Sequence, residues 1–496
     1  MRALGFFHVR VHFLEWPLTP KGFDVSHSGV RYAAFSFLCV SGLCGFAFAA
    51  CSSDAARPED TADASPVVFP PVTSDGSATD ATAPGVDGST LTDAAVAEDC
   101  TRETRAKTAP ASLYDAFVSD LAPISADATR RARVATFLAD VRAKGGGPLE
   151  DPASDRVVFL VDGAPPAGPW SVIGGFVAWD KARALPMTKV AGTDLWVADA
   201  RIPRGTAHAY KLLSGTSDTG FREDLSARNV VWDGIDHKTV GEMNGIVHAD
   251  AIPKDKPRMV AFRGVASAAM GNARDVFVWL PPTYDGPSCK KLPVVVFHDG
   301  NESLTRGDFV GPAETLYKAK PELSSILAFV ALPNQNVRMD EYTFATGGSK
   351  GSLYAKLVAD ELLPQLGKDF RVCGNQKARG VSGASLGGLI STFIAFEKPT
   401  AFGWVGAQSS SYFWADNAMI TRAAQDAKIP VRFYLDSGCP DDNCVVTDQM
   451  ETTLKGKAYD VVRIKEQNAA HDWAFWNRRM TGMLTHFREG QTAICD

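Results

Sequence analysis

The stretch "ARGVSGASLGGLISTFIAFEKP", residues 378–399, joins a short apolar run to a helical pattern through the motif Gly-x-Ser-x-Gly. Its first residues predict a strand, and Leu389, Phe393 and Phe396 recur at the spacing of a helix that turns one face towards a core. A strand, a sharp turn that bears a serine and a helix together form a nucleophile elbow. The stretch therefore predicts a nucleophile at Ser385.

The same motif occurs a second time in "ATGGSKGSL", residues 345–353, where it is centred on Ser349. The residues before that serine, "DEYTFATGG", are polar and rich in turn formers, so they do not predict a buried strand. We therefore expect Ser349 to lie in a glycine-rich surface loop.

Short apolar runs alternate with helical patterns on both sides of Ser385, over residues 251–496. This alternation predicts an α/β domain with a mostly parallel sheet that helices cover on both faces. Strands are expected at 275–280, 293–298, 326–332, 379–382, 403–408, 431–436 and 460–464, and helices at 353–366, 386–396, 419–428, 446–455 and 472–487.

A serine hydroxyl becomes an effective nucleophile when a base removes its proton, and in this kind of fold the chain order is serine, acid, histidine. Two histidines follow Ser385. His486 lies inside the predicted last helix, whereas His471 lies in the loop between that helix and the strand before it. We therefore predict His471 as the base and a surface position for His486.

The acid is expected on the loop that follows the strand in "VRFYLDSGCPDDN", residues 431–443. Asp436 lies at the end of that strand, while Asp441 and Asp442 lie beyond it. A carboxylate on the loop can reach the imidazole and select its tautomer. We favour Asp441 as the acid, with Asp442 as the alternative.

Two backbone N–H groups are needed to stabilise the oxyanion of a reacting carbonyl. One is expected from Leu386, immediately after the nucleophile, and the other from the loop in "LPVVVFHDGNES", at Gly300 or Asn301. His298 in the same segment suits the oxyanion side better than the role of base. This chemistry requires no metal and no organic cofactor.

The N-terminal part predicts export. Residues 1–51 contain Arg31, then an apolar run that ends in small residues before Cys51, which is typical of a bacterial lipoprotein leader with lipidation at that cysteine. A single transmembrane anchor is the alternative, although about 18 apolar residues are at the short end of what spans a bilayer. Residues 52–98 are rich in Ala, Asp, Thr, Ser and Pro and predict a disordered tether.

Six of the nine cysteines follow the leader, and an even number is typical of disulfides in an exported protein. We expect a local bridge Cys439–Cys444, and further bridges Cys289–Cys373 and Cys100–Cys495. A zinc site is the alternative, but the short paired spacing of zinc ribbons is missing.

Two more segments lie between the tether and the α/β domain. Residues 99–150 show helical spacing, and residues 151–250 show short β-branched and aromatic runs separated by turn residues, which predict a small all-β sandwich. The net charge of −6 argues against a nucleic-acid partner.

Taken together, "VFVWLPPTYDG", "VVVFHDG", "GASLGG", "YLDSG" and "HDWAFW" resemble the putative-esterase family, which includes enterochelin esterase, feruloyl esterases and mycolyltransferases. The resemblance covers about 275–487 and implies an α/β-hydrolase fold and a serine esterase, that is, a carboxylic ester hydrolase. "NVRMDEYT" resembles an Arg-x-x-Glu element of the family, which places Arg338 and Glu341 near the cleft; a solvated charge pair is the alternative. Trp473 of "HDWAFW" is a further possible substrate contact. Ala469-Ala470 stand where the family usually has two glycines.

The β region also resembles a known domain. Its sequence from "GPWSV" to "KLLS" is similar to the immunoglobulin-like N-terminal domain of enterochelin esterases, itself similar to glycan-binding modules. Trp170, Trp179 and Trp196 are either a sugar platform or, as we favour for large aromatic side chains, part of the sandwich core.

The resemblance implies a serine carboxylesterase that acts on a small siderophore-like ester. The leader adds the expectation that the protein is exported and anchored in a membrane through lipid, with the outer membrane as its other partner. A feruloyl or acetyl esterase acting on polysaccharide is the alternative within this class. A non-catalytic lipoprotein that binds glycan or siderophore is the alternative from another class, and the intact serine, aspartate and histidine order argues against it.

Overall fold

The computed structural model describes residues 67–68, 107–232, 243–286, 289–490 and 495, all within one compact unit of the chain. The leader, Cys51 and most of the tether lie outside the described residues, so the predictions made for them stay predictions. Within the described part, no helix is long and apolar enough to cross a membrane.

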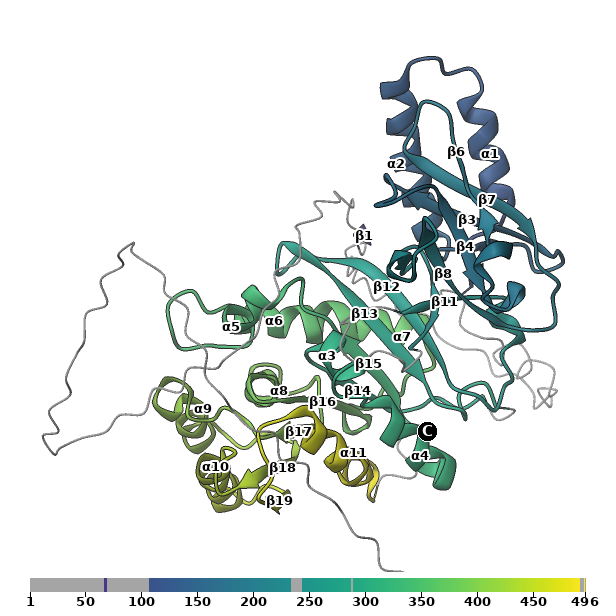
Figure 1. The fold of residues 1–496 in the computed structure, drawn as a ribbon. Helices are drawn as coiled ribbons and strands as arrows, with labels where there is room; N and C mark the ends of the chain where they lie inside the picture. The colour runs from purple at the N-terminus through teal and green to yellow at the C-terminus, as the bar shows by residue number, and fades with distance from the viewer. Residues whose placement is uncertain (1–66, 69–106, 233–242, 287–288, 491–494, 496) are drawn as a thin grey trace, which may run out of the picture. The chain divides into compact units, whose positions relative to one another are not determined.

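The strands around Ser385 form the parallel part of a large sheet (Figure 1). The order of its strands is β19-β18-β17-β16-β14-β15-β13-β12, parallel from β19 to β15 and antiparallel beyond. All seven predicted strands are present, within a few residues of the expected bounds. Their bounds are β13 Asn272–Leu280, β14 Val294–Phe297, β15 Ile326–Val330, β16 Arg379–Ala384, β17 Trp404–Gln408, β18 Arg432–Cys439 and β19 Val461–Gln467. The sequence did not predict β12, Arg258–Ser267, which pairs with β13.

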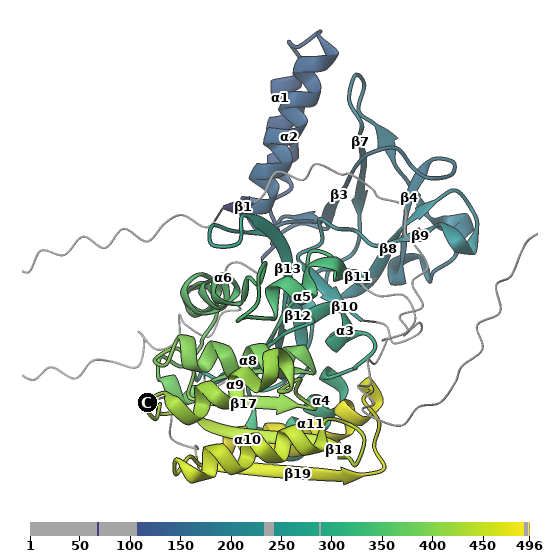
Figure 2. The ribbon, with the colours of Figure 1, turned by 90° about the vertical axis from the view of Figure 1, so that its left-hand side faces the viewer.

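Helices cover both faces of this sheet because its strands are apolar on both faces. Val294 and Val296 of β14 pack with α6 to α10 in one core, and Val295 and Phe297 pack with α4 and α11 in another. Figure 2 shows β19 at the edge of the sheet. The predicted doubly covered α/β fold is therefore confirmed. The helices are α3 Gly300–Leu304, α4 Val310–Ala319, α5 Arg338–Glu341, α6 Gly351–Lys356, α7 Leu363–Asp369, α8 Leu386–Glu397, α9 Trp414–Gln425, α10 Cys444–Gly456 and α11 Trp473–Arg488.

The chain changes direction at β14, and this positions the site. It runs from β14 to β15 on one side and then crosses to β16 on the other side of β14. In open α/β sheets, ligands bind outside the carboxyl ends of the strands at such a switch point. The segments after β14 and β16 are the predicted oxyanion loop and Ser385.

The predicted all-β region contains two packed sheets. Strand β3 is buried on both faces: Val157 and Phe159 pack towards β8, and Val158 and Leu160 pack under the hairpin of α1 and α2. The elements are α1 Ser112–Leu121, α2 Asp127–Ala143, β2 Leu149–Glu150, β3 Arg156–Asp162, β4 Trp170–Gly174, β5 Leu185–Pro186, β6 Thr188–Lys189, β7 Leu195–Arg201, β8 His208–Ser214, β9 Phe221–Arg222, β10 Asn229–Val231 and β11 Asn244–Val247.

This β region is not separated from the α/β domain by a break in the sheet. Strand β10 pairs with β11 on one side and with β12 on the other, so the main sheet continues past the boundary expected at residue 250. The short strand β1, Val67–Val68, also pairs with β12. Trp170 is buried in the core, whereas Trp179 is 40% exposed.

Two of the three expected disulfides were predicted wrongly. Cys439–Cys444 is present as expected, but Cys373 is bonded to Cys495 rather than to Cys289. The pairs Cys289–Cys373 and Cys100–Cys495 are therefore excluded. Only the short-range bridge could be predicted, because the others depend on how distant segments meet.

Candidate active site

Ser385 occupies the sharp turn between β16 and α8. Its backbone has φ 60° and ψ −119°, a strained conformation for a residue with a side chain. The flanking glycines are needed because their backbones nearly touch: a Cβ on Gly383 would lie 2.8 Å from the carbonyl carbon of Gly387. The motif therefore forms the strand–turn–helix elbow that the sequence predicts.

Ser349, the competing match, lies in a turn as expected. Its hydroxyl forms hydrogen bonds with Thr346 at 2.7 Å and Thr343 at 3.0 Å. The turn follows α5 rather than a strand. A serine engaged in this way on a loop has neither the exposed elbow nor the neighbouring base that a nucleophile requires.

His471 lies in the loop between β19 and α11 and contacts an aspartate of the neighbouring loop. Its Nδ1 lies 2.6 Å from Oδ1 of Asp442, whose side chain is 1% exposed while that of His471 is 41% exposed. A carboxylate can only accept, so Nδ1 carries the proton and Nε2 remains free to act as a base.

Asp441, the favoured acid of the sequence analysis, is exposed, and the structure pairs His471 with Asp442 instead. The reason is the path of the loop that the Cys439–Cys444 bridge closes. Oδ2 of Asp442 accepts the Gly438 N–H at 2.9 Å, which turns this side chain inward and leaves its neighbour in solvent.

A polar network holds Asp442 in place. Ser409, directly after β17, donates to its Oδ2 at 2.6 Å and in turn accepts from the Trp476 indole at 2.9 Å and from Arg479 at 3.1 Å. Burial opposes ionisation of Asp442, but the hydrogen bonds from His471, Ser409 and Gly438 outweigh it, so the pKa of this carboxyl is below its ordinary value. Asp442 is therefore an ionised acceptor.

Asp436, the strand-end candidate, lies beneath this network and does not contact His471. It is fully buried, accepts from Gln408 Nε2 at 3.2 Å and lies 3.0 Å from Arg479 Nε. Burial raises the pKa of this carboxyl to about 6. Arg479 thus faces both buried aspartates and supports the loop that carries Asp442.

Side chains of the segment 409–411 contact both Ser385 and Asp442. Ser411 Oγ lies 3.2 Å from Ser385 Oγ, while Ser409 contacts Asp442. Both Ser385 and His471 belong to the described residues, and no hydrogen bond joins them in this structure. Such contacts are often loose without substrate, and rotation about χ1 would redirect the serine hydroxyl.

The predicted oxyanion loop lies against the nucleophile elbow. A Cβ on Gly387 would lie 3.3 Å from Asp299 Oδ2, so the loop after β14 touches the first turn of α8. Leu386 begins α8, and Gly300 and Asn301 begin α3, so their N–H groups have no intrahelical acceptor. A Cβ on Gly300 would lie 2.7 Å from the backbone of Val330. Only glycine therefore fits at the start of α3.

Arg338 lies near the cleft as expected, within 3.5 Å of the Ala384 carbonyl beside Ser385, whereas Glu341 does not. Arg338 forms a two-pronged ion pair with Asp299, at 2.7 and 2.8 Å, and so braces the oxyanion loop. Glu341 pairs with Arg274 at 2.8 Å, and both side chains are 1% exposed. Neither the cleft position expected for Glu341 nor a solvated Arg338–Glu341 pair is found.

The remaining candidates lie near the site or below it. His298 is buried against the Tyr354 hydroxyl at 2.9 Å, and burial lowers the pKa of its imidazole to about 3, so it is neutral. His486 is buried and accepts from the Trp404 indole at 3.1 Å, which corrects the expected surface position. Trp473 is half-buried and packs on Trp476, which itself contacts His471.

Replacing Glu341 by alanine is expected to destabilise the fold without changing substrate affinity. The change leaves the Arg274 guanidinium buried and unpaired, which typically costs about 3–5 kcal/mol in the free energy of unfolding. Urea unfolding measures this cost, and KM of the folded fraction should stay at the wild-type value. Asp340→Ala, its exposed neighbour, is the control and should change stability by less than about 0.5 kcal/mol. If KM rose in Glu341→Ala but not in Asp340→Ala, Glu341 would affect substrate binding, and the purely structural role given to it here would be wrong.

Glu302 of α3 predicts a pH dependence of stability. Its Oε1 accepts from Gln335, its Oε2 is buried without a partner, and burial together with the charge of Asp299 raises the pKa of this carboxyl to about 7. Between the pKa of Glu302 in the unfolded chain and its raised pKa in the folded protein, the folded protein therefore keeps this carboxyl protonated while the unfolded chain does not. The free energy of unfolding should then fall as pH rises from about 5 to about 8, by up to about 3 kcal/mol. Urea unfolding of Glu302→Gln should show a smaller fall, and an equal fall in both proteins would refute this prediction.

Several supporting residues were missed by sequence reasoning. Ser409, Ser411 and Trp476 form the network around Asp442 and Ser385, and Arg479 lies below it. The run "SSSYFW" directly after a predicted strand was a usable signal, because side chains at carboxyl strand ends gather at one edge of the sheet.

The doubly covered parallel sheet with a serine at its strand–helix elbow defines the class of the domain: it is an α/β-hydrolase. Residues 267–487 match the family model described as "Putative esterase", so this part of the chain is similar to that family.

The proteins to which the chain is similar include two curated proteins and one solved structure. "Uncharacterized protein YbbA" of Bacillus subtilis is 31% identical over 169 residues, which are 32% of this chain and 65% of that protein. "Endo-1,4-beta-xylanase/feruloyl esterase" of Xylanibacter ruminicola is 22% identical, over 44% of this chain and 30% of that protein. The enterobactin esterase of Shigella flexneri has 16% identity and a TM-score of 0.41, over 67% of this chain and 93% of that structure. The chain thus spans about two thirds of the length of the first of these relatives.

Proposed function

We propose that the chain is a serine carboxylesterase in which Ser385 is the nucleophile, His471 the base and Asp442 the acid. The observation that carries the proposal is that one carboxyl edge of the sheet holds the strained serine, the free Nε2 of a histidine and a buried ionised aspartate. The esterase-family match over the same segment supports it.

The proposed reaction has two steps that share one base. The Ser385 hydroxyl attacks the ester carbonyl carbon while His471 Nε2 takes its proton, and Asp442 stabilises the imidazolium through Nδ1–H. The oxyanion accepts hydrogen bonds from the N–H of Leu386 and of Gly300 or Asn301. The tetrahedral intermediate expels the alcohol, which takes the proton from His471. Water, deprotonated by His471, then cleaves the acyl-enzyme to the free acid and regenerates Ser385.

For the substrate, we propose a small siderophore-like ester first and a feruloyl or acetyl ester of polysaccharide second. The first rests on the resemblance of the motifs and of the β region to enterochelin esterases. The second is supported by the curated relative named endo-1,4-beta-xylanase/feruloyl esterase, although it covers less than half of this chain.

We also propose that the protein works outside the cytoplasm, anchored through lipid at Cys51. The leader pattern and the two disulfides Cys373–Cys495 and Cys439–Cys444 support this location, because disulfides persist in oxidising compartments. Fractionation of the host cells tests it, and recovery of the protein in the cytoplasmic fraction would contradict the proposal.

The experiment that tests the function is a substrate panel combined with active-site labelling. A ferric catecholate trilactone, feruloylated xylan and short aryl esters are compared by kcat/KM, and a fluorophosphonate probe reports an activated serine. If the probe labels the protein but no ester of the panel is hydrolysed, the activated serine is supported and the proposed substrates are wrong. An unlabelled wild-type protein would support the non-catalytic binding lipoprotein instead.

A further inference from the structure

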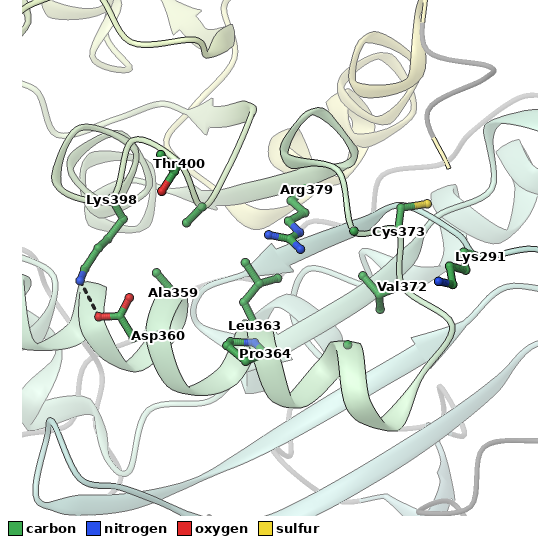
Figure 3. Close-up of a pocket in the computed structure, with 13 residues that line it drawn as sticks. Lys291, Ala359, Asp360, Leu363, Pro364, Val372, Cys373, Arg379, Lys398 and Thr400 are labelled. Atoms are coloured by element: carbon green, nitrogen blue, oxygen red, sulfur yellow. Dashed lines mark hydrogen bonds and ion pairs between the residues drawn. The ribbon is translucent and has the colours of Figure 1, made fainter. Parts of the chain in front are cut away.

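A cavity lies at the amino-terminal edge of the parallel sheet (Figure 3). Its volume is about 550 Å³, which is in the range of small-molecule sites. Strand β16 begins at Arg379 in this cavity and ends just before Ser385, so the two places are about 20 Å apart. Side chains from α7, β16 and the ends of neighbouring segments line it, among them Lys291, Asp360, Leu363, Val372, Arg379 and Lys398.

The walls of the cavity are held by backbone contacts and a disulfide. Leu292 and Val372 form a parallel bridge, in which the Leu292 N–H donates to Arg371 at 2.8 Å and the Cys373 N–H donates to Leu292 at 3.0 Å. Cys373 lines the cavity and is bonded to Cys495. The site is therefore preformed, and the free-energy cost of ordering it on ligand binding is small.

The cavity carries an excess of positive charge. Lys398 is paired with Asp360, the carboxylate of the lining, as the dashed line in Figure 3 shows. Arg379 and Lys291 have no ion pair within the described residues. The lining therefore holds three cations against one carboxylate, which favours an anionic ligand.

Arg379 is the unusual group among these cations. Its Nε is buried without a hydrogen-bond partner, and its guanidinium makes no hydrogen bond or ion pair in the described part of the chain. Arg274 also has a buried Nε without a hydrogen-bond partner, but it holds the Glu341 carboxylate through another nitrogen. Burial lowers the pKa of Arg379, which reflects the cost of leaving this cation without a counter-charge. In Figure 3 its side chain points from β16 towards Leu363.

We propose that this cavity binds the oxyanion of a small organic acid, a carboxylate or a phosphate monoester, with Arg379 as its anchor. The planar guanidinium presents parallel N–H donors that match two oxygens of either group. Lys291 and Lys398 add charge at the sides, and Leu363, Pro364 and Val372 offer an apolar surface to the rest of the molecule. The site does not rest on the proposed esterase function, because it shares no residue with the site of Ser385.

Calorimetric titration of the full chain tests the proposal, with benzoate, phenyl phosphate and inorganic phosphate as probes at constant ionic strength. We expect wild-type protein to bind at least one organic anion more tightly than inorganic phosphate, because inorganic phosphate has no apolar part to contact Leu363, Pro364 and Val372. The comparison of benzoate with phenyl phosphate separates the two ligand classes. Arg379→Met should weaken binding by about tenfold or more, and Arg379→Lys by less. Lys291→Met, at the exposed rim of the cavity, should weaken anion binding severalfold. This variant tests the site if Arg379→Met does not fold.

Two controls separate this site from other binding. Arg183→Met changes an exposed arginine of the β region and should leave the affinity unchanged. Ser385→Ala should also bind the anions as the wild type does, whatever its esterase activity. The proposal is overturned if no probe binds the wild type, or if Arg379→Met and Lys291→Met bind as tightly as Arg183→Met.

Discussion

Ser385→Ala is expected to lower kcat for ester hydrolysis by about 10⁴–10⁶-fold, with KM little changed. In the proposed reaction the hydroxyl forms the bond to the acyl group, so its loss removes the covalent step and leaves only the stabilisation that the oxyanion donors supply. The fold should be unaffected, because the one hydrogen bond of this hydroxyl among the described residues is with Ser411, and the strained backbone at φ 60° is held by the glycines beside it. Initial rates with a short aryl ester and covalent labelling by a fluorophosphonate measure the effect.

Ser349→Ala is the matched control for this variant, since it removes the same atom from the same sequence motif. In the described part of the chain its hydroxyl forms hydrogen bonds with Thr343 and Thr346 of the same turn, so kcat and labelling should stay within about twofold of the wild type. If Ser385→Ala were still labelled, or if Ser349→Ala lost activity instead, the assignment of the nucleophile would be wrong.

Asp442→Asn is expected to lower kcat by about 10³–10⁴-fold, the second largest effect. The carboxylate accepts the proton of His471 Nδ1 at 2.6 Å, and this leaves Nε2 free to take the proton of Ser385. An amide that donates to Nδ1 would place the imidazole proton on Nε2, where it blocks the base. The buried amide would also face the donors Ser409 and Gly438, so some loss of stability is expected.

Asp441→Asn is the control for this second prediction, because it makes the same chemical change one residue earlier. Its side chain is exposed and does not contact His471, so activity should be unchanged. A thermal melt corrects for any unfolding of Asp442→Asn, and the pH profile of kcat gives a readout that instability would not alter. Equal activities of the two variants, both folded, would refute the role of Asp442.

The anion cavity and the active site are independent in their residues, which makes their tests independent as well. Arg379 is the first residue of β16, and Ser385 directly follows the last residue of that strand. A change of esterase rate on anion binding would show that the strand between them couples the two sites. Equal rates with and without the anion would leave two separate binding functions on one sheet.

Local sequence patterns predicted the strands, the doubly covered sheet, the elbow at Ser385 and the short Cys439–Cys444 bridge. Each of these depends on residues close together in the chain, such as an apolar run of one period or glycines beside a serine. The position of His471 beside the acid loop was also predictable, because chain order and a loop before the last helix were enough to select it from two histidines, while its role as the base stays a prediction.

The choice between Asp441 and Asp442 depended on the folded loop, since adjacent residues of one type differ only in the direction of their side chains. The same holds for Arg338 and Glu341, which meet Asp299 and Arg274 rather than each other. The sequence also did not reveal the Cys373–Cys495 bridge or the continuity of the sheet through β10 and β12. Nor did it reveal that the Arg379 guanidinium has no partner among the residues that the structure describes. Local periodicity reports which face of an element is buried, but the partners of a buried charge or thiol come from distant segments, and only packing brings those together.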